Sequence, residues 1–207
     1  MIKQTVPHHN HYILFFKPYD VLCQFSHEPD RERKTLADYG PFPKNVYPVG
    51  RLDADSEGLV LLTDDKQLKH FLLEPRYRHP RTYLVQVERV PTEVDLECLR
   101  KGVVIEHRKT LPAEVELLNH EPKIPPRTVP IRFRKNIPTS WLTITLYEGR
   151  NRQVRKMTAA VGCPTLRLLR VGMASLRLGE LQPGEKRELS TKEIVKLRQI
   201  VLRSPKD

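Results

Sequence analysis

Three carboxylates at alternate positions mark the segment GRLDADSEGLVLLTDD, residues 50–65. Asp53, Asp55 and Glu57 have the spacing of the first ligands in EF-hand calcium loops. An EF-hand also needs a helix before the loop, but the preceding segment PKNVYPVG, residues 43–50, contains two prolines that disfavour a helix. The calcium hypothesis is therefore disfavoured, and the alternative is a turn that presents one reactive carboxylate, Asp53.

The composition of the turn GRLD, residues 50–53, supports that alternative. Gly50 allows an unusual backbone angle, and Leu52 can anchor the turn in a hydrophobic core. Arg51 and Asp53 would then face the space above the turn. Taken alone, these two residues are explained better by ordinary turn chemistry, with Arg51 as a solvated cation and Asp53 as a local hydrogen-bond acceptor.

A second segment, EGRNRQVRKM at 148–157, concentrates positive charge at a predicted strand-to-helix turn. A helix that begins after Gly149 presents free backbone N–H groups and the positive end of its dipole. Residues 152, 155 and 156 share one face of such a helix. A surface of this kind suits phosphate groups, although a solvated basic helix is the alternative. The cations of the segment are Arg150, Arg152, Arg155 and Lys156.

The overall charge agrees with a polyanion-binding protein. The 207 residues include 36 Lys and Arg against 25 Asp and Glu, which gives a net charge of +11. A soluble protein that merely happens to be basic is the alternative. The three cysteines are widely spaced and form no C-x-x-C pair, so neither a disulfide framework nor a zinc site is indicated. No apolar run reaches the length of a membrane helix, and we expect a cytoplasmic protein without a metal.

Periodicity and turn residues predict an α+β fold in which hairpin-like strand pairs are interrupted by single helices. Strands are predicted within 12–25 and at 59–63, 81–88, 103–105, 113–118, 141–149, 166–171 and 174–178. Helices are predicted at 66–75, 91–102, 152–162 and about 191–202, with a further helical turn near Leu36. Asp64 or Asp65 is expected to cap the first of these helices, and Asn151 the third. The segment 119–140 has five prolines and five basic residues, which predicts an extended surface excursion.

Read jointly, the motifs resemble one known family. The segments GRLDADSEGLVLLT, RTYLVQV and LYEGRNRQVRKMTAAVGCPTLRLLRVGMASLRLGELQPGE are similar to the RsuA-type pseudouridine synthases of ribosomal RNA, and the resemblance covers nearly the whole chain from about residue 12. It implies a mixed, mainly antiparallel sheet flanked by helices around a central RNA-binding cleft. It also implies isomerisation of one uridine to pseudouridine in 23S large-subunit ribosomal RNA, without a cofactor. A non-catalytic ribosomal RNA-binding or assembly protein is the alternative.

The resemblance also implies roles for individual residues. Asp53 would be the catalytic aspartate, Tyr83 the tyrosine that packs on the target base, and Arg155 the cation that pairs with Asp53. Gly50, Leu52 and Gly149 would shape the turns. RNA contacts would come from Arg51, Arg150, Asn151, Arg152, Gln153 and Lys156, and from Arg132, Arg134 and Lys135 of the excursion.

The domain organisation follows from the same resemblance. Residues 1–11 are predicted to be a flexible tail, 12–203 a single catalytic domain and 204–207 a second tail. Residues 1–11 are too short for the S4-type RNA-binding domain of many relatives, so the catalytic domain is expected to hold its own substrate, as a monomer. The other alternative is a hydrolase, which would need a second catalytic carboxylate or a metal held by Asp53, Asp55 and Glu57.

Overall fold

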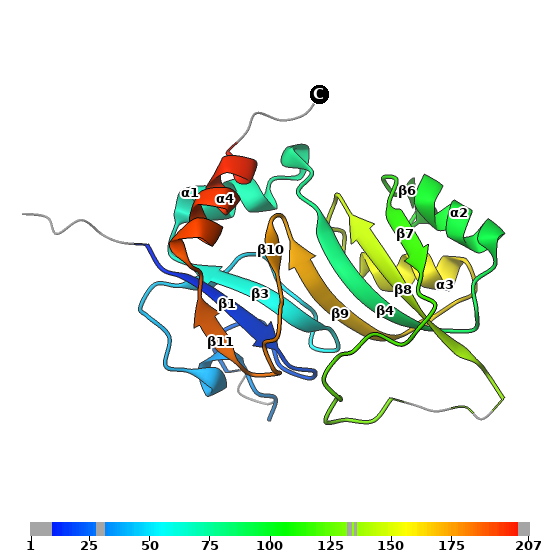
Figure 1. Ribbon diagram of the computed structural model, residues 1–207, viewed down its shortest axis with the longest axis horizontal. Coiled ribbons are helices and arrows are strands. Elements are labelled where there is room, and N and C mark those ends of the chain that lie inside the picture. The colour runs from blue at the N-terminus through cyan, green and yellow to red at the C-terminus, as the bar shows by residue number, and fades with distance from the viewer. Residues whose placement is uncertain (1–9, 28–31, 132–133, 135, 203–207) are drawn as a thin grey trace, which may run out of the picture.

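The computed structural model describes residues 10–27, 32–131, 134 and 136–202, and it contains one large mixed sheet (Figure 1). The predicted α+β class is confirmed. The strands are β1 (Tyr12–Lys17), β2 (Tyr47–Pro48), β3 (Glu57–Thr63), β4 (Arg81–Glu88), β5 (Val104–Ile105), β6 (Arg108–Lys109), β7 (Glu114–Leu117), β8 (Thr139–Leu146), β9 (Thr165–Met173), β10 (Leu176–Arg177) and β11 (Lys186–Glu188). The helices are α1 (Lys66–Leu73), α2 (Glu93–Lys101), α3 (Gln153–Ala160) and α4 (Thr191–Val201), with short 3-10 turns η1 (Leu36–Tyr39) and η2 (Pro75–Tyr77).

The large sheet has two halves that meet at strand β9. The order is β11-β1-β3-β9-β4-β8-β7, and Figure 1 shows β11, β1 and β3 on one side of β9 with β4, β8 and β7 on the other. The β3–β9 pair is parallel and joins Glu57 to Leu169 and Gly58 to Arg170. Gly58 has φ +103°, and a Cβ there would lie 2.3 Å from the Arg170 carbonyl oxygen. Only glycine therefore allows the two halves to approach so closely at this point.

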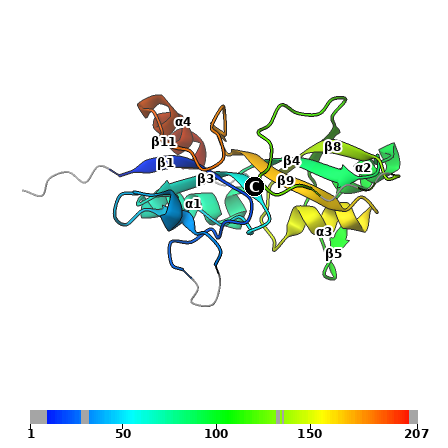
Figure 2. The same ribbon diagram turned by 90° about the horizontal axis from the view of Figure 1, so that it is seen from below.

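A separate hydrophobic cluster covers each face of the sheet. Val60 and Leu62 of β3 belong to one cluster, together with residues of α2 and α3, and Leu59 and Leu61 belong to the other, together with residues of α1 and α4. Figure 2 shows α3 and α4 on opposite sides of the sheet. Because β3 is buried on both faces, its sequence is a continuous apolar run rather than an alternating one.

Most predicted elements are present, with differences at the ends of individual strands. Strand β4 has the predicted bounds, whereas β3 begins at Glu57 instead of residue 59, and β8 begins at Thr139, inside the predicted excursion. In the described part of the excursion, 119–131, 134 and 136–138, the chain forms neither helix nor strand. No helix in the described part of the chain is long and apolar enough to span a membrane.

Candidate active site

The loop between β2 and β3 has the predicted construction. Gly50 lies in the left-handed region with φ +73°, and the Leu52 side chain is buried in the cluster shared with α3. The Ser56 backbone N–H donates to the Asp53 carbonyl at 3.0 Å and closes a tight turn. Arg51 is exposed, and 40% of the Asp53 side chain is accessible to solvent. The loop thus presents the Asp53 carboxylate at the surface while its backbone is fixed below.

Glu57, the third carboxylate of the segment, points away from this loop. Its side chain is buried and accepts two hydrogen bonds from the Arg167 guanidinium, at 2.8 and 2.9 Å. A buried carboxylate in a bidentate pair with arginine is not available to a metal. Within the described residues, no group of three or more His, Cys, Asp or Glu side chains is placed to hold a metal ion. Glu57 is therefore not placed to serve as the ligand that the calcium and metal-nuclease hypotheses require.

Asp53 forms its ion pair with Arg152. The Arg152 Nη1 lies 3.5 Å from Asp53 Oδ2, and its Nη1 and Nη2 donate to the two Asp55 oxygens at 3.1 and 2.8 Å. Burial would raise the pKa of Asp55, but the hydrogen bond from Arg152 and the charges of Arg155 and Arg152 bring this pKa below its ordinary value. Both carboxylates of the loop, Asp53 and Asp55, therefore form ion pairs with the Arg152 guanidinium.

Arg155 reaches the same loop through Asp55 rather than through a direct ion pair with Asp53. Its Nη2 donates to the Asp55 carbonyl at 2.7 Å, and its Nε lies 3.4 Å from Asp55 Oδ2. A longer hydrogen bond joins Nη1 to the Thr165 carbonyl at 3.4 Å. Burial lowers the pKa of Arg155 below its ordinary value, and the negative charges of Asp55 and Asp53 offset this effect only in part. Arg155 thus contacts the neighbouring acidic residue Asp55, where a direct ion pair with Asp53 was predicted.

The turn before α3 is held by internal hydrogen bonds. Gln153 is buried; its Nε2 donates to Glu148 Oε1 at 2.7 Å, and its Oε1 accepts from the Arg150 backbone N–H at 3.0 Å. The same Glu148 oxygen accepts from the Leu111 N–H at 2.8 Å. Gly149 does not have a left-handed backbone, and a Cβ there would make only an ordinary van der Waals contact, 3.6 Å from the Arg81 guanidinium. Gln153 shapes the turn, and its contact with RNA stays a prediction.

Helix α3 is not capped by Asn151 as predicted. The N-cap residue is Arg152, which has a left-handed backbone with φ 51° and makes no side-chain capping bond. The Asn151 side-chain oxygen instead accepts a hydrogen bond from Lys156 Nζ at 3.2 Å. A side-chain contact within the helix turn has therefore taken the place of the expected cap.

Two predicted RNA-binding cations of this segment contact the small β5–β6 hairpin. The Arg150 guanidinium donates to the carbonyls of Ile105 and Arg108 at 2.7 and 3.0 Å. Lys156 Nζ lies 2.5 Å from Glu106 Oε1. These contacts attach the hairpin to the N-terminal end of α3, so the cations have internal partners that local spacing did not indicate. Their contacts with RNA stay predictions.

Tyr83 lies on β4, in the middle of the sheet. It pairs with Ile144 of β8 and with Arg170 of β9, and its side chain is 9% exposed. It belongs to the same hydrophobic cluster as Leu52, the buried neighbour of Asp53. The position is compatible both with a core tyrosine and with a ring at the floor of the site, and the stacking role stays a prediction.

The predicted excursion is anchored to the sheet at two points in its described part. Arg134 Nη1 lies 3.2 Å from Glu88 Oε2, and the Pro125 carbonyl accepts from Arg167 Nη2 at 2.9 Å. Arg132 and Lys135, which were predicted to contact RNA, lie outside the described residues.

Sequence reasoning missed one lysine beneath the loop. Lys17 ends β1 and is fully buried, and its Nζ donates to the carbonyls of Pro18, Val21 and Ala54 at 2.9, 2.7 and 3.3 Å. Burial lowers the pKa of Lys17 to about 8. A lysine directly after the apolar run ILFF was the available signal. Lys17 ties the end of β1 to the residue between Asp53 and Asp55.

The family of the protein follows from comparison with known proteins. Residues 11–160 match the family model described as RNA pseudouridylate synthase. The chain therefore belongs to the RNA pseudouridine synthase family, and the resemblance seen in the sequence motifs is confirmed.

The similar proteins agree with this assignment. The chain is 55% identical over 177 residues to ribosomal large subunit pseudouridine synthase E of Vibrio parahaemolyticus, covering 86% of this chain and 73% of that protein. It is 51% identical over 171 residues to the protein of the same name in Xanthomonas axonopodis pv. citri, covering 83% and 90%. Among solved structures, a pseudouridylate synthase crystal structure matches with a TM-score of 0.74 at 30% identity, over 91% of this chain and 74% of that one.

Proposed function

We propose that this protein converts one uridine of large-subunit ribosomal RNA into pseudouridine, in the cytoplasm and as a monomer, and that Asp53 is the catalytic group. The substrate class is supported by the names of relatives that are 50–55% identical to this chain. The assignment of the active site rests on the Asp53 carboxylate. This group is accessible to solvent, and its loop is held by contacts with Lys17, Arg152 and Arg155.

The reaction needs little from the protein besides a carboxylate and a pocket. The bond from the ribose to a uracil nitrogen breaks, the base turns over, and a bond from the ribose to a uracil carbon forms in its place. Reactant and product contain the same atoms, so no redox partner is consumed. A carboxylate such as that of Asp53 suits attack on the sugar or assistance to the departing base.

The surrounding residues support this use of Asp53. The Arg152 guanidinium lies beside the carboxylate, and the partly buried Arg155 holds the backbone of the next acidic residue, Asp55. A uridine in folded RNA must leave its stack to reach the loop, which costs a few kcal/mol. Stacking of the base on an aromatic ring, for which Tyr83 is the proposed residue, would offset about 1–3 kcal/mol of that cost.

The test is the mapping of pseudouridine in large-subunit ribosomal RNA. RNA from cells that lack the gene is incubated with the purified protein, and the modified positions are compared before and after. We expect one position to be modified, with no free uracil released and with no effect of a chelator. Tight binding of this RNA without any modification would instead indicate the non-catalytic RNA-binding alternative, and release of uracil would indicate a hydrolase.

A further inference from the structure

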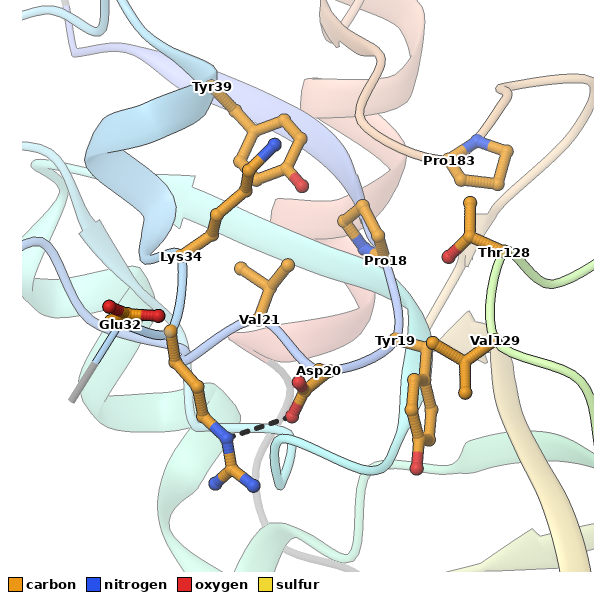
Figure 3. A pocket seen from close by; sticks show the side chains of 11 residues that line it. Pro18, Tyr19, Asp20, Val21, Glu32, Lys34, Tyr39, Thr128, Val129 and Pro183 are labelled. Carbon is orange, nitrogen blue, oxygen red and sulfur yellow. Dashed lines mark ion pairs between the residues drawn. The ribbon is translucent and has the colours of Figure 1, made fainter.

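A groove of about 1020 Å³ is lined in part by the residues that directly follow β1 (Figure 3). Pro18 and Val21 lie between Tyr39 at one end and Tyr19 at the other, and Val129 of the excursion stands beside Tyr19. The groove is thus built from the segment after β1, from η1 and from the excursion.

The groove is joined to the catalytic loop by direct hydrogen bonds. The Asp20 backbone N–H donates to the Ala54 carbonyl at 2.7 Å, and Lys17 Nζ reaches the same carbonyl at 3.3 Å. Ala54 stands between Asp53 and Asp55. Tyr19 is also close enough to Arg155 to influence the pKa of that guanidinium. The groove therefore adjoins the loop that carries Asp53.

The aromatic rings that line the groove have cations beside them. The Arg127 guanidinium carbon lies 4.0 Å from the centre of the Tyr19 ring, and it is oriented by hydrogen bonds to the carbonyls of Val129 and Pro130. At the other end, Lys34 Nζ lies 6.0 Å from the centre of the Tyr39 ring. Aromatic faces that stack with bases, combined with cations that meet phosphates, are the usual means of holding single-stranded nucleic acid.

A further cation in the groove is only weakly engaged. Arg33 Nε lies 2.9 Å from Asp20 Oδ1, and 46% and 48% of these two side chains are exposed. Exposed ion pairs of this kind contribute little free energy. A phosphate group can therefore compete with Asp20 for Arg33 at small cost.

We propose that this groove binds an unpaired nucleotide next to the target uridine in the RNA chain, with its base on Tyr19 and its phosphate near Arg33 and Lys34. The inference rests on the proposed function, because it assigns a second contact for the same RNA. It places part of the substrate recognition on residues 18–21 and 32–34 rather than on helix α3, whose cations have internal partners.

The test compares two RNAs that contain the modified uridine. The short RNA is the smallest stem-loop that the wild-type protein modifies, and the extended RNA adds unpaired nucleotides on its 5′ or 3′ side. We expect the wild type to bind one extended RNA more tightly than the short one. Tyr19→Ala should reduce the ratio of the two affinities by roughly five- to 150-fold, the range expected for loss of base–aromatic stacking. Tyr19→Phe, which keeps the ring, should retain the ratio.

Tyr47→Ala is the matched control. Tyr47 is also a partly exposed ring near a cation, with Lys69 Nζ 5.6 Å from its centre. It pairs with Thr63 at the far end of β3, about 20 Å along the strand from Glu57, where the catalytic loop ends. This variant should leave the affinity ratio unchanged.

A second variant keeps the test decisive if Tyr19→Ala does not fold. Val129 is 46% exposed on an irregular segment, so Val129→Asp should leave the fold intact while it places a negative charge beside Tyr19, in the groove proposed to hold the nucleotide. This variant should lower the same ratio. A wild-type protein that binds both RNAs equally, or groove variants that weaken both RNAs equally, would overturn the proposal while leaving the modification of the short RNA to test the proposed function separately.

Discussion

Arg152 lies 3.5 Å from Asp53 and 2.8 Å from Asp55, so one guanidinium joins the proposed catalytic carboxylate to the next carboxylate of its loop. Arg155 contacts Asp55 from the protein side, and its side chain is 14% exposed against 41% for Arg152. The two arginines therefore have different tasks. Arg155 holds the loop backbone, and Arg152 balances charge at the surface.

This difference predicts unequal effects of two substitutions. Arg155→Met removes the donor to the Asp55 carbonyl and should lower kcat at least about tenfold, because a misplaced catalytic group loses much of its rate advantage. Arg152→Gln removes an exposed ion pair worth about 0–1 kcal/mol and should lower kcat by about fivefold at most. Single-turnover assays at saturating RNA measure both. The reverse order of effects would contradict the assignment of tasks.

Tyr83 gives a graded prediction for the substrate base. Tyr83→Phe keeps the ring and should bind RNA as the wild type does, whereas Tyr83→Ala should lose both affinity and turnover. Because the ring is 9% exposed and packed in a core cluster, the Ala variant should also unfold more easily, by about 3–5 kcal/mol. Affinity and thermal unfolding are measured on the same samples. Wild-type turnover in a folded Ala variant would assign Tyr83 to the core alone.

Lys17 predicts a pH dependence of stability. Its pKa is about 8 in the folded protein against an ordinary value of 10.5, so between these two values the unfolded chain binds more protons than the folded chain. The contribution of Lys17 to the free energy of unfolding therefore increases with pH between these two values and is constant at lower pH. Urea unfolding of the wild type and of Lys17→Met should show a free-energy difference that grows in favour of the wild type from pH 8 to 10. A difference that is flat over this range would show that Lys17 is not buried in its charged form.

The excursion predicts a change in the salt dependence of RNA binding. Replacing Arg132, Arg134 and Lys135 by Ala should reduce the slope of log affinity against log salt by roughly two to three units, if all three contact phosphate, since each contact accounts for about 0.7–0.9 units. The saturating single-turnover rate should be retained. Lys192 and Lys196 are exposed on α4, on the other side of the sheet from α3 (Figure 2), and their joint replacement should leave the slope unchanged. An unchanged slope in the triple variant would show that the excursion does not contact the phosphates of the RNA.

The elements of the fold were predictable where a pattern is local. β4 alternates in hydrophobicity and has the predicted bounds. The start of β3 was not predictable, because Glu57 looks like a loop carboxylate until Arg167, 110 positions away, neutralises it. The short strands β2, β6 and β11 were also missed, because segments of two or three residues are strands only through their pairing partners.

The position of the site was predictable, but the contacts between its arginines and its loop were not. GRLD and the basic segment were both recognised, yet the partners of Arg152 and Arg155 in the loop are 97 to 100 positions away in the chain. Spacing within a helix cannot indicate such contacts. Lys17 was missed for the same reason, since its contact with Ala54 joins two segments that the sequence separates.

The most direct measurement of the central proposal is the turnover of Asp53→Asn. The substitution keeps the size of the side chain and removes its negative charge, so the loop and its contacts with RNA should persist. We expect no detectable pseudouridine in large-subunit ribosomal RNA under conditions in which the wild type modifies it completely, with an RNA affinity within about twofold of the wild type. Pseudouridine formation by the Asn variant at a rate comparable to that of the wild type would show that Asp53 is structural and that the proposed mechanism is wrong.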